Sequence, residues 1–179
     1  VHPCDDISAE ELTAQLLDLN GPSYMRTTRN KVPRMYEDGD KLRIGKGSVL
    51  KEGDDLAIFS CGVMVVEAMA ASDTLSAEGI QCSVVDMHTI KPLDKSLISK
   101  LATRCGCFVS AEDHSVIGGL GSALSEWIAA NNPIPLEMVG VKDMFGQSGS
   151  SSELMEIMGL TRTDICEAAR KAVGRKNSL

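Results

Sequence analysis

The segment from Ala111 to Ser122 carries the densest set of reactive side chains in the sequence. Glu112, Asp113 and His114 are followed by three glycines, just before a stretch with helical periodicity. A histidine beside carboxylates can transfer protons, and the free N–H groups of a helix N-terminus can hold an anion. Alternatively, the glycines only permit a tight turn and close helix packing. Without the lysine of a P-loop, the structural interpretation is favoured.

A second histidine lies in the segment 86–94, together with Lys91. His88 could act as a base or a metal ligand. However, no other histidine or carboxylate stands at metal-ligand spacing from it, and a single histidine among apolar residues is more often structural. Lys91 could extend along the surface or pair with a carboxylate. A structural role is therefore expected for His88 as well.

A basic segment contains Arg26, Arg29, Lys31 and Arg34. Arginine suits bidentate binding of phosphate or carboxylate, so these side chains could hold an anionic ligand. The alternative is a solvated or interface-facing segment that pairs with acidic helices. The sequence contains no nucleophile elbow, Walker motif, paired Cys-x-x-Cys or His-Glu-x-x-His motif, so the residue types alone name no reaction.

The elements that must position these residues follow an alternating order after Asp55. Short apolar runs alternate with amphipathic segments, which predicts an α/β fold: a three-layer, open, mainly parallel sheet with helices on both faces. In such sheets, function collects at the carboxyl ends of the strands. The predicted strands are 56–61, 82–87, 107–111 and 136–141, and the predicted helices are 65–75, 95–105, 120–131, 153–158 and 162–173.

The first fifty residues follow no such alternation. Ser8 and Glu11 form a capping-box pattern, which predicts a helix over 9–19. A short strand is expected at 23–27. Residues 31–47 have no periodicity and contain Pro33, so they are expected to be a linker.

Composition excludes several classes of protein. The formal net charge of −7 argues against a general nucleic-acid or anionic-membrane binder. No apolar run is long enough to span a membrane, and the first twenty residues do not resemble a secretory signal. The six cysteines are scattered through apolar runs, so free thiols are expected, with no metal site. We therefore expect a cytoplasmic protein, and because residue 1 is not Met, a fragment of a longer one.

The order of the motifs resembles that of the transketolase-like thiamine-diphosphate enzymes over nearly the whole chain. The matching motifs are Val1–Asp6, Thr28–Pro33, Val85–Asp94, Glu112–Gly121, and Phe145–Gly149 followed by Gly159–Thr161. The resemblance implies three parts. Residues 1–30 would be the tail of the pyrimidine-binding domain, 31–47 a linker, and 48–179 the C-terminal domain.

The resemblance also implies an activity. The complete enzyme would transfer a two-carbon ketol unit between sugar phosphates in the pentose phosphate pathway, with thiamine diphosphate and Mg²⁺ as cofactors. Both cofactors are held by earlier parts of such enzymes, so none is expected on this chain, which would serve mainly domain packing and assembly. The implied partners are the preceding part or a partner subunit, and a second copy in a homodimer.

One functional residue is carried over from the family. Its Ser/Thr-Arg-Gln/Asn-x-x-Pro motif matches 28–33 and gives Arg29 the role of holding the substrate phosphate. This sequence has Thr28 where Ser is familiar, and Lys31 where a neutral residue is common. No catalytic residue is generally assigned to the family's C-terminal domain, which supports structural roles for His88 and His114.

Three alternatives remain open at this point. The β subunit of a 2-oxoacid dehydrogenase shares the motif from Thr89 to Asp94, although the glycine motif after His114 and the stretch Phe145–Gly149 favour transketolase. Deoxyxylulose-phosphate synthase has more distant motifs. A stand-alone, non-catalytic assembly module is the third.

Overall fold

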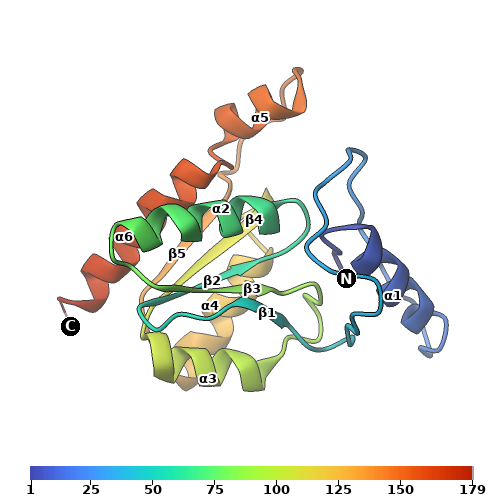
Figure 1. The fold of residues 1–179 in the computed structure, drawn as a ribbon, viewed down its shortest axis with the longest axis horizontal. Helices are drawn as coiled ribbons and strands as arrows, with labels where there is room; N and C mark the ends of the chain where they lie inside the picture. Colours follow the sequence, from blue (N-terminus) through green and yellow to red (C-terminus); the bar gives the residue numbers. More distant parts are fainter. Residues whose placement is uncertain (179) are drawn as a thin grey trace.

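The computed structural model describes residues 1–178 and contains a five-stranded sheet between two helical layers (Figure 1). The strand order is β1-β3-β2-β4-β5. The strands are β1 (Ser48–Lys51), β2 (Leu56–Ser60), β3 (Cys82–Asp86), β4 (Phe108–Ser115) and β5 (Leu136–Val141). The helices are α1 (Asp6–Leu16), α2 (Met64–Ala77), α3 (Lys95–Cys105), α4 (Leu120–Asn131), α5 (Ser151–Met158) and α6 (Arg162–Lys176). The predicted α/β class is confirmed.

Strand β2 lies at the centre of the sheet and is buried along its whole length. It pairs in parallel with β3 on one side and β4 on the other. Leu56 and Ile58 point into one apolar cluster, whereas Ala57 and Phe59 point into the other. Because both faces are covered, the strand reads as a continuous apolar run rather than an alternating one.

Helices α2 and α6 cover one face of the sheet, and α3 and α4 cover the other (Figure 1). Two predicted helix ends are confirmed at α3. The Asp94 side chain caps its start by accepting the N–H of Leu97 at 3.1 Å, and Gly106 ends it with a φ of 69°. Thr161 caps α6 as predicted, and that helix continues through Gly174 to Lys176, beyond the expected end.

Helix α1 begins three residues before its predicted start. Asp5, not Ser8, is the N-cap, and its Oδ1 accepts the N–H of Ser8 at 2.8 Å. The Ser8 hydroxyl accepts the Asp5 N–H in return, at 3.0 Å. Ser8 is thus the third helical residue of the capping box and not its N-cap, so the predicted position of the N-cap is wrong.

The segment between α1 and β1 contains no helix or strand, so the predicted strand at 23–27 is wrong. This stretch is hydrogen-bonded to Val1, whose ammonium donates to the Tyr24 carbonyl and whose own carbonyl accepts the Arg26 N–H. Farther on, Tyr36 and Leu42 are buried against α1 and α2, so the segment packs on the protein body. The division at residues 30 and 47 remains a prediction, and Leu179 lies outside the described residues.

The sequence prediction also missed two features of the sheet. Strand β1 was not predicted; it is an edge strand that pairs antiparallel with β3 and is only partly buried. Strand β4 continues to Ser115 instead of ending at Ala111. Glu112, Asp113 and His114 therefore lie on the strand and not in the loop after it.

We predict that Asp5→Ala lowers the free energy of unfolding by about 2–3 kcal/mol. The substitution removes the helix cap and also leaves the backbone N–H groups of Met35 and Tyr36 without the Asp5 Oδ2 acceptor. The neighbouring variant Asp6→Ala is the control, since it loses an exposed pair with Arg34 and should destabilise the protein much less. Urea denaturation measures both; equal costs would contradict the prediction.

Candidate functional site

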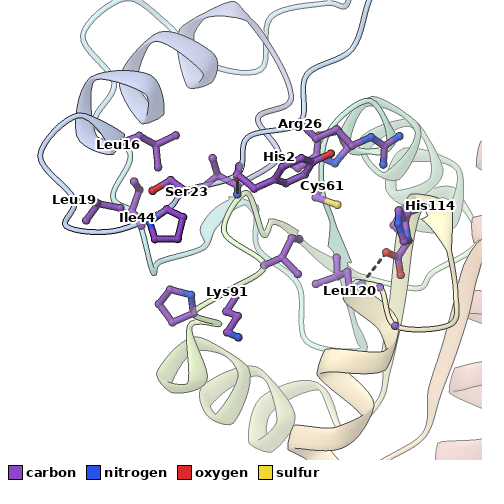
Figure 2. A pocket seen from close by; sticks show the side chains of 18 of the residues that line it. His2, Leu16, Leu19, Ser23, Arg26, Ile44, Cys61, Lys91, His114 and Leu120 are labelled. Carbon is purple, nitrogen blue, oxygen red and sulfur yellow. Dashed lines mark hydrogen bonds between the residues drawn. The ribbon is translucent and has the colours of Figure 1, made fainter.

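A groove of about 520 Å³ lies between the N-terminal segment and the carboxyl ends of β2, β3 and β4 (Figure 2). The sequence analysis predicted that functional residues would lie at these carboxyl ends. The walls are mainly apolar, while Arg26, Lys91, Glu112 and His114 supply polar groups. The apolar wall residues include Leu16, Leu19, Tyr24, Ile44, Ile90 and Leu120. The structure thus brings four of the predicted candidates together in this groove, whereas the other five do not line it: His88, Asp113, Arg29, Lys31 and Arg34.

Glu112 fills the anion position at the start of α4. The carboxylate is 3% exposed and accepts the N–H of Leu120 at 2.7 Å and of Gly121 at 2.8 Å. Burial raises its pKa. A Cβ on Gly119 would lie 2.1 Å from its Oε2. The glycines therefore let the protein's own carboxylate cap the helix, so no free anion site remains there.

Asp113 and His114 do not form a proton relay with Glu112. The Asp113 carboxylate pairs with Arg26, with Oδ2 and Nη2 2.6 Å apart, and His2 lies 3.8 Å from its other oxygen. Burial lowers the pKa of His2 to about 4, so that ring is neutral at pH 7. His114 is exposed, and its Nδ1 lies 3.0 Å from the Ser115 carbonyl oxygen. The geometry supports the structural interpretation of this segment.

His88 follows β3 and lies in the interior of the protein. It is fully buried, and its Nδ1 lies 3.1 Å from the Thr89 hydroxyl. Burial lowers its pKa to about 4, so the ring is uncharged at pH 7. Its backbone carbonyl accepts the His2 N–H, which ties the start of the chain to the end of β3. Lys91 is exposed at the rim of the groove.

Asp86 is an unusual buried residue that the sequence analysis did not single out. It ends β3, is fully buried, and accepts hydrogen bonds from the Tyr36 hydroxyl at 2.9 Å and the Cys4 thiol at 3.4 Å. Burial raises its pKa to about 7. The only sequence signal was one acidic residue ending an apolar run. Its partners stand 50 and 82 positions away, which the pattern could not reveal.

The four cations of the basic segment divide into two that form ion pairs and two that do not. Arg26 and Arg34 are bound by carboxylates, Asp113 in one case and Asp6 in the other. Arg29 and Lys31 are exposed, and within residues 1–178 neither side chain has a hydrogen bond or ion pair.

Two grooves, of about 480 and 430 Å³, lie on either side of this segment. Thr28, Asn30 and Lys31 line both, but Arg29 lines neither. The arginine predicted to bind phosphate therefore lines none of the three grooves described here.

The described residues offer no group of three metal-ligating side chains. All six cysteines are free and buried. Together with the Glu112 cap, this means that residues 1–178 do not fit a Mg²⁺–diphosphate site. Over residues 1–178, no helix combines the length and apolar character needed to cross a membrane.

We predict that the stability difference between the native protein and Asp86→Asn decreases as pH rises from 4 to 8. Folding raises the pKa of this carboxyl group to about 7, from about 4 in the unfolded chain. The group therefore stabilises the folded state most below pH 4, and this contribution is lost as the pH approaches 7. The change should reach a few kcal/mol, at about 1.4 kcal/mol per pH unit. Urea denaturation across the range measures it; parallel pH profiles would disprove it.

Comparison with known proteins places this architecture in a family. Residues 45–165 match the family model for the transketolase C-terminal domain. The chain is 41% identical over 175 residues to a 6-deoxy-6-sulfo-D-fructose transketolase subunit from a Clostridium species, covering 98% of this chain and 54% of that protein. It is 37% identical over 174 residues to an apulose-4-phosphate transketolase subunit from Phocaeicola vulgatus, covering 97% of this chain and 55% of that one.

A solved structure described as a split gene transketolase, inactive beta4 tetramer, matches with a TM-score of 0.95 and 41% identity. The match covers 97% of this chain and 57% of that one. The chain thus spans about half the length of the curated relatives it matches. The match to the C-terminal domain model covers most of the chain, and we conclude that this protein belongs to the transketolase family.

Proposed function

We propose that this chain is the C-terminal part of an enzyme that transfers a two-carbon ketol unit between sugar phosphates. The observation that carries the proposal is the 41% identity over 98% of the chain to a transketolase subunit. The structural agreement with a split gene transketolase over 97% of this chain supports it. The chain alone is inactive in this proposal, since its described residues supply no complete catalytic site.

Thiamine diphosphate and Mg²⁺ are the proposed cofactors of the complete enzyme. The cofactor supplies the carbanion chemistry, while protein groups position the substrate. Because Glu112 occupies the helix terminus and no metal-ligand group exists within the described residues, we assign cofactor binding to another part of the enzyme.

The groove beside α1 is the proposed contact surface for that other part. Leu17, Leu19 and Tyr24 are 83%, 47% and 76% exposed, an apolar surface that a partner would cover. The extended segment beside Tyr24 is hydrogen-bonded to Val1 on one edge within the described chain, so its other edge can accept a strand.

The complete enzyme would act as a homodimer of the assembled unit in the cytoplasm, in the pentose phosphate pathway.

Deoxyxylulose-phosphate synthase is the second candidate. The chain is 37% identical over 160 residues to that enzyme from Trichormus variabilis, covering 87% of this chain but 25% of the enzyme. The lower coverage ranks it below the transketolase subunits.

We expect the assembled enzyme, containing this chain and the part that holds the cofactor, to convert xylulose 5-phosphate and ribose 5-phosphate in a coupled assay. Activity should require thiamine diphosphate and Mg²⁺. Pyruvate consumption with an aldose phosphate acceptor, in place of ketol transfer, would support the second candidate and reject the first.

We predict that Arg29→Ala raises the KM for phosphorylated sugars at least tenfold in the assembled enzyme, with a smaller change in kcat. The exposed guanidinium, unpaired within the described chain, would hold the substrate phosphate through charge-assisted hydrogen bonds worth about 1.5–3 kcal/mol. Arg43→Ala removes another exposed arginine, which lies outside the basic segment, and should leave the KM unchanged. An unchanged KM for Arg29→Ala would reject the assignment.

A further inference from the structure

Lys31 lies two residues from Arg29 and carries an uncompensated charge. The two flanking arginines are neutralised: Arg26 lies 2.6 Å from Asp113 Oδ2, and Arg34 donates to Asp6 Oδ1 at 2.9 Å. The Lys31 ammonium has no such partner within residues 1–178.

The carboxylates that line the same grooves as Lys31 already bind other groups of the chain. On one side, Asp113 binds Arg26, and Glu67 accepts the N–H of Arg162 at 2.8 Å. On the other side, Asp6 binds Arg34, and Asp5 accepts N–H groups from α1 and from Met35 and Tyr36. These carboxylates therefore do not hold Lys31, and its charge is available to a ligand.

A second cation would compensate the phosphate charge that one arginine leaves unbalanced. Near pH 7 a phosphate monoester carries a charge of about −1.5 to −2, so one arginine compensates only part of it. A lysine binds phosphate as a point charge, without the fixed fork geometry of arginine. Two unpaired cations on one exposed segment match a dianion better than a monoanion or a neutral hydroxyl.

We propose that Lys31 is a specificity-determining residue that acts with Arg29 to select substrates ending in a dianionic phosphate. This inference rests on the proposed function, because it needs the phosphate to lie at Arg29. It goes further by assigning a residue at which the family motif usually has a neutral side chain.

The test uses the assembled enzyme and three ketose donors that differ only at the terminal group: phosphate, sulfonate and hydroxyl. We expect Lys31→Gln to lower kcat/KM about tenfold for the phosphate, mainly through KM. The loss should be smaller for the monoanionic sulfonate and below about twofold for the hydroxyl. Lys31→Arg should restore most of the preference. Lys100→Gln, an exposed lysine on α3, is the charge-matched control and should change none of the three.

Equal losses for all three donors, or no loss for the phosphate, would overturn the proposal for Lys31. Arg29→Ala, measured in parallel, separates this failure from that of the proposed function. If Arg29→Ala removes the phosphate preference and Lys31→Gln does not, only the inference about Lys31 fails. If neither variant changes the preference, the phosphate site itself is misplaced.

Discussion

Burial of the central sheet on both faces is the constraint on which the other features depend. Strand β2 is covered by α2 and α6 on one side and by α3 and α4 on the other, so its faces cannot present polar chemistry. The carboxylates of the three central strands lie toward the carboxyl ends, where Asp86, Glu112 and Asp113 stand. All three are bound there by groups of the same chain, so this edge is used to hold the protein together.

The N-terminal segment is attached to this edge by buried carboxylates as well as by apolar packing. Asp86 accepts from Tyr36 and Cys4, and Asp113 holds Arg26. Each contact joins residues distant in the sequence and fixes the segment that carries Arg29 and Lys31. Substrate recognition by those two side chains would therefore depend on hydrogen bonds made at the end of the sheet.

The sequence predicted the regular part of the fold well, because periodicity and caps are local signals. Strand β2, the Asp94 cap and the end of α3 at Gly106 are examples. It failed where the determining contacts are distant: edge strand β1 depends on pairing with β3, and the role of Asp86 depends on Tyr36 and Cys4. Similarly, the glycine motif showed that a close approach was needed, but only the structure identified the Glu112 carboxylate as the approaching group.

The hydrogen bond from Cys4 to Asp86 also has a chemical consequence. Burial, with the adjacent Asp86 and Asp5 carboxyls, raises the pKa of the Cys4 thiol. Since the thiolate is the form that attacks oxidants and electrophiles, this thiol is held in its unreactive state. The residue that joins the start of the chain to the sheet is therefore held in the protonated form that reacts least with oxidants.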